Sequence, residues 1–492
     1  MSTVDASVEL LDADLAQTLF CASSPVTFLD HFRVPYEVAP HAVRSGVQQL
    51  WMPRGGPRLL WRAGTPARAQ RVVISDSAAG IPIFASILSD ASVQLILEQQ
   101  GGMWERAREV TSPDGEPLGW IWREADGSVF LPFDPNEVIH SFWTERYLEV
   151  SSGGRLRGGR RRLVRAYYRV RPVLPRRVQI ALRRRFARLQ ARSRFPRWPV
   201  ETCLHDFFDL MFAILAGIAG GAIPHIAPWP DGYEWALVLT HDVEHATGLA
   251  FAPEVLGVEA DHGLRSAWNI VPRRYPVDLS EVRTLIAAGC EVGVHGIDHD
   301  GRDLESLATW QDRLPEARRA AEAWGAIGFR SAALHRDPEW LQLLECEYDS
   351  SFPDTDPFEP QDGGCCTWLP FFHGSMVELP LTLPQDHTLF VILGQSDATM
   401  WIDKAEFLRG RGGLALVDTH PDYLVNDPIL AAYRQFLQHF ATDATAWHAL
   451  PREVCAWWRL RAESSLYRDD DGWQISGPAG ADARIAYRGG SW

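Results

Sequence analysis

The chain has almost no lysine and few cysteines. Lys404 is the only lysine among 492 residues, so arginine supplies nearly all the basic charge. The seven cysteines are scattered, odd in number and never spaced as Cys-x-x-Cys. This distribution argues against a disulfide framework and favours a reducing compartment.

Long apolar runs are missing as well. The longest, residues 210–223, holds several glycines and ends before Pro224, whereas a transmembrane helix needs roughly 20 apolar residues. We expect it to be a buried or membrane-surface helix. The first 19 residues alternate acids with apolar side chains and lack the basic start and apolar core of a secretory signal. We therefore expect a cytoplasmic protein.

The charge of the chain is negative overall but unevenly distributed. A net charge of −15 argues against general nucleic-acid binding. Residues 155–197, however, contain 17 arginines and no acid. Within them, Val178, Leu182, Phe186 and Leu189 recur at helical spacing, which predicts an amphipathic basic helix. Two roles stay open: contact with an anionic membrane surface or with phosphates, and a linker helix docked on the acidic remainder.

A chain of this length predicts two or three domains. We expect an N-terminal α/β domain of unknown role at 1–150, an Arg-rich helical linker at 151–228, a catalytic domain at 229–462 and a short β-rich extension at 463–492. In the first domain, 71–75 and 93–97 are predicted strands, and Trp120 and Trp122 belong to a predicted hairpin next to the turn at 113–115.

From about residue 229 the pattern becomes strand, loop and helix in repetition. Such alternation predicts an α/β fold with a parallel sheet, open or closed into a barrel. The predicted helices include 279–288 and 303–325. The predicted strands are 235–239, 291–294, 327–330, 376–379, 389–393 and 414–417.

Polar side chains follow four of these strands. His241 and Asp242 follow the first, His295 the second, Arg330 the third and His420 the last. Carboxyl ends of parallel strands share one edge of the sheet, where active sites of such folds lie. An acid and two histidines delivered in this way are typical ligands of a catalytic divalent metal, so Asp242, His295 and His299 are the predicted metal ligands.

Residues 235–425 resemble the polysaccharide deacetylases in the order and spacing of their motifs. The paired acids of the first motif correspond to His241 and Asp242, the His-x-x-x-His motif to His295 and His299, and the later motifs to Arg330 and His420. The resemblance implies a distorted (β/α) barrel, a divalent metal, zinc being expected, and removal of acetyl groups from glycans. It implies that His420 is the general acid.

The first motif departs from the family where the general base is expected, because His241 replaces an acid. A neutral imidazole is a possible base near pH 7. Glu244 is the alternative base and a possible partner for Arg330, and His241 as a metal ligand is the third option. Asp418, or an aspartate of 348–351, is expected to keep His420 protonated.

Three further residues are expected to bind substrate. Tyr348 and Asp349 begin an Asp-rich stretch that is expected to form part of the cleft wall, and Arg336 is placed to meet an anionic group or to cap a local acid.

These observations predict a metal-dependent hydrolase that removes acetyl groups from N-acetylated sugars in surface-glycan synthesis. The substrate is expected to be nucleotide-linked or lipid-linked, with the Arg-rich segment meeting diphosphates or the membrane. A glycan-binding or scaffold module without activity, and a metal-dependent phosphoesterase, are the alternatives. The sequence does not define the oligomeric state.

Overall fold

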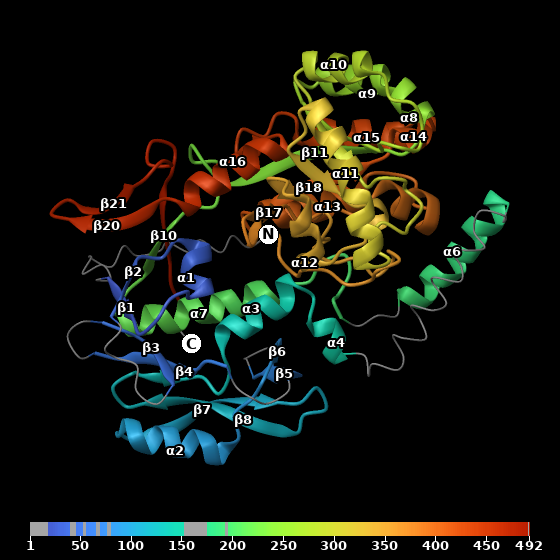
Figure 1. Cartoon of the computed structure of the whole chain (residues 1–492). Helices are drawn as coiled ribbons and strands as arrows, with labels where there is room; N and C mark the ends of the chain where they lie inside the picture. The colour runs from blue at the N-terminus through green and yellow to red at the C-terminus, as the bar shows by residue number, and fades with distance from the viewer. Residues whose placement is uncertain are drawn as a thin grey trace, which may run out of the picture.

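The computed structural model describes residues 18–39, 46–52, 56–64, 69–75, 80–151, 175–191, 195–490 and 492. A mixed sheet in the N-terminal part and a largely parallel sheet in the C-terminal part lie on either side of helix α7 (Cys203–Ala219) (Figure 1). The hydrophobic core is continuous between the two parts. Residues 152–174 and 192–194, which belong to the predicted Arg-rich linker, lie outside the described residues.

The N-terminal sheet has nine strands in the order β2-β1-β3-β4-β9-β8-β7-β5-β6. Its strands are β1 (Leu19–Cys21), β2 (Tyr36–Val38), β3 (Val47–Trp51), β4 (Arg58–Arg62), β5 (Gln70–Ile74), β6 (Ile81–Ala85), β7 (Trp104–Thr111), β8 (Pro117–Glu124) and β9 (Val129–Phe130). Neighbouring residues of a strand face opposite sides: Leu59 joins the main core, whereas Leu60 packs with the apolar face of α2 (Asp90–Gln100).

The predicted strand at 71–75 and the predicted hairpin are confirmed by β5 and by the β7–β8 pair. The predicted strand at 93–97 is wrong, because these residues lie inside α2. Ser89 caps that helix by accepting a hydrogen bond from the Ser92 amide. The other helices up to α7 are α1 (Thr27–Phe32), α3 (Pro135–Trp143), α4 (Tyr147–Ser151) and α6 (Arg176–Gln190).

The C-terminal sheet orders its strands β16-β17-β15-β14-β13-β12-β11-β18, with β19 also paired to β11. All pairs are parallel except β16 with β17. The strands are β11 (Trp235–Val243), β12 (Ser266–Ile270), β13 (Glu291–His295), β14 (Gly328–Arg330), β15 (Tyr348–Asp349), β16 (Phe371–His373), β17 (Met376–Glu378), β18 (Leu414–Thr419) and β19 (Ala446–His448).

The expected barrel is present as a curled, incompletely paired sheet. Residues 381–383 bridge its two sides outside any named strand. The Leu381 amide donates to the Phe352 carbonyl at 2.9 Å, and the Leu383 amide donates to the Leu416 carbonyl at 3.0 Å. The predicted strand at 389–393 is wrong: it belongs to the π-helix η5 (His387–Leu393), which ends at Gly394 in the left-handed conformation.

Helices cover the outside of this sheet (Figure 1). They are α8 (Ala246–Ala250), α9 (Ala252–Ala260), α10 (Leu279–Ala287), α11 (Leu307–Trp324), α12 (Pro338–Leu341), α13 (Thr399–Arg409), α14 (Pro421–Leu424), α15 (Asp427–Phe440) and α16 (Pro451–Ala462), with short 3-10 turns η3 (Ala332–Leu334) and η4 (Gln342–Leu344). The predicted helices at 279–288 and 303–325 are confirmed by α10 and α11.

The C-terminal residues lie against the N-terminal part of the chain. Strand β22 (Ile485–Arg488) pairs with β10 (Ile223–Ile226), while β20 (Ser465–Asp469) and β21 (Gly472–Ser476) form a hairpin. The Arg461 guanidinium donates to the carbonyls of His31 and Ile226, both at 2.8 Å. Among the described residues, no helix has both the length and the apolar character needed to cross a bilayer.

A buried carboxyl at the amino end of the C-terminal sheet gives a first prediction. Glu291 accepts hydrogen bonds from the Tyr348 hydroxyl (2.8 Å) and the Arg452 amide (2.9 Å). Burial raises the pKa of Glu291 from 4.5 to about 7, so the folded chain holds this proton more tightly than the unfolded chain. This contribution to stability is complete below pH 4.5 and lost as the pH rises through 7.

Replacing Glu291→Gln should remove that dependence. Between pH 5 and pH 8, the free energy of unfolding of the wild type should fall by roughly 3 kcal/mol more than that of the variant. Urea denaturation at four pH values measures this difference. Parallel pH profiles for the two proteins would contradict the assignment.

Candidate active site

Strand β11 determines which predicted residues reach the site. It continues to Val243, four residues beyond its predicted end, so the polar residues after Leu239 still alternate between the two faces of the sheet. Thr240 and Asp242 meet Arg330 on the inner face. His241 lies on the opposite face, toward the helices.

The structure contradicts His241 as a base or a metal ligand. Its side chain is fully buried. Nε2 lies 2.7 Å from Oε1 of Glu259 in α9, and Nδ1 lies 2.7 Å from Oγ1 of Thr419. The Tyr433 hydroxyl donates to the same Glu259 oxygen at 2.6 Å. With both ring nitrogens engaged behind the sheet, His241 has a structural role.

Arg330 occupies the centre of the inner face. Its Nη1 donates to Thr240 Oγ1 at 2.8 Å and pairs with one oxygen each of Asp242 (3.1 Å) and Asp418 (2.9 Å). Its Nε donates to the Ser350 carbonyl. The predicted pairing with Glu244 is therefore not formed; the guanidinium is shared by two other carboxylates.

This arrangement separates the pKa values of the two aspartates. Burial raises the pKa of Asp242, but Arg330 and the nearby His295 outweigh it and lower that pKa to about 2. Burial and the charge of Asp242 together raise the pKa of Asp418 well above its usual range. Asp242 is thus the ionised carboxylate of the pair at neutral pH.

Two groups of side chains have the composition of a metal site. Glu244, His295 and His299 form one, and Asp242, Asp418 and His420 form the other, with ligand atoms within 4.8 Å of one another in each group. In the second group the Arg330 guanidinium already lies between the two aspartates, where it would repel a cation. The first group is therefore the better candidate, with Glu244 rather than the predicted Asp242 as its carboxylate.

The first group fits a divalent metal. His295 Nδ1 lies 3.2 Å from the Arg330 carbonyl, which sets that ring nitrogen as the donor. Among the described residues, its buried Nε2 has no hydrogen-bond partner. His299 Nε2 lies 3.0 Å from Glu244 Oε1. Burial and the Nδ1 contact leave His295 with a free lone pair aimed into the group, as a metal ligand requires.

Local backbone geometry holds these ligands in place. His299 adopts a left-handed φ of 51°, a conformation that non-glycine residues keep only where surrounding contacts enforce it. Asp422 in turn fixes the loop of Glu244, since its carboxylate accepts hydrogen bonds from the amides of Glu244 (3.1 Å), His245 (3.2 Å) and Gly248 (3.0 Å).

Arg274 lies beside the same group. It donates to Nδ1 of His299 at 2.6 Å and to Nε2 of His245 at 2.7 Å. A donor at Nδ1 leaves the proton of the neutral His299 ring on Nε2. Binding of a cation at Nε2 requires the other tautomer, with the ring proton on Nδ1, and Arg274 would then have to turn away.

His420 is paired with an acid that the sequence did not indicate. Its Nδ1 lies 2.6 Å from Asp386 Oδ1, and its amide donates to Asp386 Oδ2 at 2.8 Å. Nε2 faces Glu244 at 3.7 Å and Asp418 at 4.0 Å. Burial lowers the pKa of His420, but Asp386 and its other acidic neighbours raise it well above the usual value. The ring is therefore protonated at neutral pH.

The three predicted substrate residues have other partners. The Tyr348 hydroxyl reaches Glu291 at the amino end of β13, away from the metal group. Asp349 is buried and accepts from Ser351 Oγ at 2.7 Å, and burial raises its pKa to about 6. Arg336 is buried in a two-bond ion pair with Glu145 (2.6 and 2.8 Å), which joins the N-terminal part to the C-terminal sheet. Tyr348 and Asp349 are thus engaged with protein groups rather than placed to meet substrate, whereas Arg336 meets an acid, which is the second of its two expected roles.

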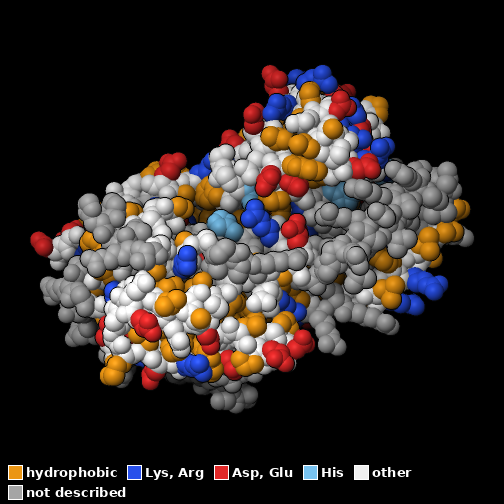
Figure 2. Space-filling model, turned by 60° about the horizontal axis from the view of Figure 1, so that its bottom comes forward, with side chains coloured by type: hydrophobic (Ala, Val, Ile, Leu, Met, Phe, Trp, Pro, Cys, Tyr) orange, Lys and Arg blue, Asp and Glu red, His pale blue; other side chains and the backbone are white. Residues whose placement is uncertain are grey.

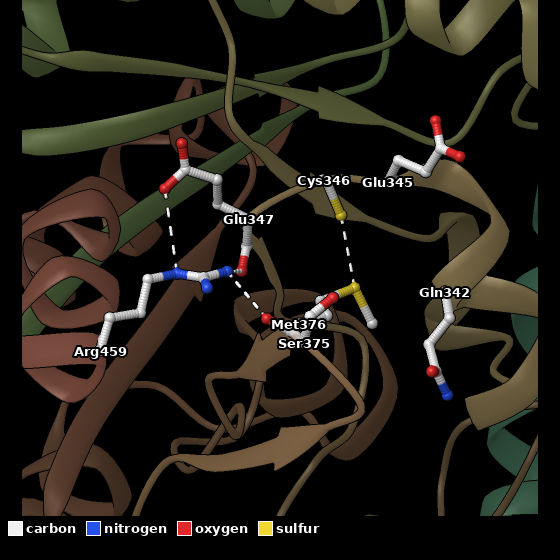
Figure 3. Close-up of a pocket in the computed structure, with 7 residues that line it drawn as sticks. All are labelled: Gln342, Glu345, Cys346, Glu347, Ser375, Met376 and Arg459. Atoms are coloured by element: carbon white, nitrogen blue, oxygen red, sulfur yellow. Dashed lines mark hydrogen bonds and ion pairs between the residues drawn. The ribbon is translucent and has the colours of Figure 1, made fainter. Parts of the chain in front are cut away.

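One cavity of about 350 Å³ lies elsewhere (Figure 3). Its wall includes Glu347, just before β15, and Met376, at the start of β17, so it opens at the amino ends of strands. Arg459 crosses it to donate to the Glu347 and Ser375 carbonyls. The cavity is at the opposite edge of the sheet from the metal group.

Two features of the sequence could have indicated the roles of Glu244 and Asp386. The alternation of an extended strand places Asp242 and Glu244 on one face and His241 on the other. Asp386 follows Pro384 and lies just before the run 389–393. The apolar residues of that run predicted a strand, so no role was predicted for the acid in front of it.

No family model matches this chain, and no curated protein does. Solved structures do match about half of it. A protein from Mycobacterium smegmatis described as a polysaccharide deacetylase is 21% identical, with 47% of this chain and 93% of that chain covered and a TM-score of 0.40. PuuE allantoinase is 15% identical (47% and 92% covered, TM-score 0.38).

A family 4 carbohydrate esterase from Streptomyces lividans, solved with acetate, is 14% identical, with 44% of this chain and 91% of that chain covered and a TM-score of 0.30. The chain resembles the polysaccharide deacetylases. All three TM-scores are 0.40 or lower.

The metal group gives a prediction that separates Glu244 from Asp242. After loading with zinc, the wild type and Asp242→Asn should retain metal, whereas Glu244→Gln, His295→Ala and His299→Ala should lose it. Arg274→Ala should bind zinc more tightly, because the competing donor to His299 is gone. Metal analysis after gel filtration measures the content, and circular dichroism checks the fold. Loss of metal in Asp242→Asn but not in Glu244→Gln would contradict the ligand set.

The pair between Arg336 and Glu145 gives another prediction. Arg336→Met leaves a buried carboxylate without its partner, which should lower the free energy of unfolding by about 3–5 kcal/mol. Adding Glu145→Gln should restore part of this loss. The KM of the folded variants should not change. Unchanged stability with a raised KM would instead support a substrate-binding Arg336.

Proposed function

We propose that this chain is a metal-dependent hydrolase that removes an acetyl group from an N-acetylated sugar or glycan intermediate. The observation that carries the proposal is the grouping of three functions at one sheet edge. These are a metal-ligand set, an ionised carboxylate beside it (Asp242) and a protonated imidazole facing it (His420). Amide hydrolysis needs this combination of base and acid on opposite sides of the reacting carbonyl.

Glu244, His295 and His299 would hold the divalent ion, with zinc expected, and the ion would polarise the acyl carbonyl and make a water more acidic. Asp242 is the proposed general base. Its carboxylate lies 3.5 Å from His295 Nδ1 and is oriented by Arg330 and by Asn269 Nδ2 at 2.9 Å. Because Arg330 keeps it ionised, it can accept a proton from water throughout the physiological range.

His420 is the proposed general acid. Asp386 holds Nδ1, so the proton that can be given to the leaving amine is on Nε2, which faces Glu244. The carboxylate partner also stabilises the imidazolium before the proton is given up. Asp386 is the acid within hydrogen-bond distance of the ring. Asp418, which was expected to keep His420 protonated, lies 4.0 Å from Nε2 and adds to the raised pKa, whereas Asp349 contacts Ser351 instead.

The choice of an acetylated sugar comes from the motif resemblance, and the acyl chemistry comes from the geometry. A nucleotide-linked or lipid-linked intermediate of surface-glycan synthesis, handled inside the cell, remains the proposed substrate. The geometry favours deacetylation over the phosphoesterase alternative. An amine is a poor leaving group unless it receives a proton, and the protonated His420 can give it one. A binding module without activity would not need the Asp386–His420 pair.

Acetate release tests the proposal. The zinc-loaded chain is offered a panel of N-acetylated sugars, free, nucleotide-linked and lipid-linked, and acetate is followed by an enzyme-coupled assay. Asp242→Asn and His420→Ala should each lower kcat by roughly 10²–10⁴-fold, as expected for loss of a base or an acid. The exposed residue Asp312 provides a matched control, since Asp312→Asn should keep full activity.

Release of phosphate rather than acetate from a phosphorylated panel would favour the phosphoesterase. Tight glycan binding without any product would favour the binding module. Full activity in Asp242→Asn would contradict the proposed base.

A further inference from the structure

Helix α6 has two unlike faces, and one of them packs on the C-terminal part. Ala187 is buried with Phe358 and Ile392 in a small cluster. Arg183 donates to the Phe358 carbonyl at 3.1 Å and Arg184 to the Val391 carbonyl at 3.0 Å. The inner face thus attaches through apolar packing and backbone carbonyls, and the charge of Arg183 also acts on the buried acids Asp356 and Glu359, where it opposes the burial that raises their pKa. This docking is what the linker alternative expected.

The outward face combines apolar and basic side chains. Val178, Leu182 and Leu189 are 42%, 44% and 57% exposed and lie on one stripe, because they are separated by four and seven residues. Arg185 and Arg188 are exposed beside them. The helix contains six arginines and no acid in 15 residues. Figure 2 shows hydrophobic and basic side chains together at the end of the molecule where α6 lies in Figure 1.

The position of α6 relates this face to the active site. The helix packs on η5, which begins directly after Asp386, the partner of His420. Gln190 also donates to the carbonyl of Glu359 at 3.2 Å. A surface that receives the outward face of α6 would therefore lie on the same side of the molecule as the proposed general acid.

We propose that the outward face of α6 is a docking surface for an anionic lipid bilayer, and that it presents the active site to a glycan held at the membrane. This deepens the proposed function, on which the identity of the glycan substrate rests. Exposed leucines inserted at the headgroup level, with arginines against anionic lipid, are the physical basis of interfacial helix binding.

A second copy of α6, a free diphosphate and an anionic bilayer could each cover this face, and its side chains favour the bilayer. Two copies of α6 packed together would bring arginines of the same sign into contact without any acid between them, which disfavours a symmetric dimer. A free diphosphate would use the arginines but leave the leucine stripe exposed. An anionic bilayer uses both kinds of side chain.

Vesicle sedimentation of the full chain tests the proposal. The protein should sediment with vesicles that contain phosphatidylglycerol and far less with pure phosphatidylcholine, and the binding should weaken as salt is raised. Arg185→Gln with Arg188→Gln should weaken binding roughly 30-fold, from about fivefold for each arginine. Leu182→Gln with Leu189→Gln should also weaken it, because insertion is lost.

Leu95 and Met103 of the N-terminal part provide the matched control. They are 61% and 81% exposed, so Leu95→Gln with Met103→Gln removes similar apolar area elsewhere and should leave vesicle binding unchanged. Every variant should release acetate from a soluble substrate as the wild type does, which separates a failure of docking from a failure of the proposed function.

Three results would overturn the proposal: no sedimentation with anionic vesicles, equal binding by the α6 variants and the wild type, or an α6-dependent dimer in light scattering. Binding that free pyrophosphate abolishes and that the leucine variants do not weaken would assign the face to soluble diphosphates instead.

Discussion

The buried guanidinium of Arg330 is the interaction on which the site depends. It is fully enclosed and bonds to three strands, through Thr240 and Asp242 on β11, Asp418 on β18 and the residue after β15. A buried cation with two carboxylates is stable only as a set, since loss of the arginine would leave negative charges without a partner in a medium of low dielectric. Its position between the two aspartates also favours Glu244 as the acid that would hold a metal.

The same constraint explains how far the sequence could predict the site. Apolar runs followed by polar residues predicted that Asp242, His295, Arg330 and His420 would meet at one edge, although β11 ends four residues later than predicted. The alternation of side chains within β11 was the decisive detail. Once the strand is known to reach Val243, His241 must point to the helix layer and Glu244 must join the histidines. The motif comparison aligned His241 with the base and Asp242 with the metal-binding acid, whereas the proposed residues lie one and two positions later, at Asp242 and Glu244.

Other errors have a local physical cause. The runs at 93–97 and 389–393 are apolar enough for strands, but each lies inside a helix that starts earlier. Ser89 accepts a hydrogen bond from the Ser92 amide and Asp386 from the His387 amide at these helix starts. Residues whose partners are distant in sequence could not be predicted at all. Arg336 meets Glu145, 191 residues away, and Asp386 meets His420, 34 residues away, and no local pattern encodes either pair.

The N-terminal part contributes to the site through these distant contacts. Arg336 and Glu145 fix the segment after β14, while the Tyr147 hydroxyl donates to the Gly364 carbonyl at 2.7 Å in the loop that precedes β16. Helix α6 packs nearby, where its Ala187 contacts Phe358 and Ile392. The residues around His420 are thus supported from outside the parallel sheet, which gives the first half of the chain a structural role in the proposed chemistry.

We propose that the metal is held by Glu244, His295 and His299, with Arg330 excluding it from the neighbouring aspartates. Anomalous scattering at the zinc edge, from crystals of the zinc-loaded chain, tests this most directly. We expect a single strong peak among the carboxylate of Glu244 and the two imidazoles. A peak among Asp242, Asp418 and His420, or none in a crystal that retains Arg330 between its two aspartates, would contradict it.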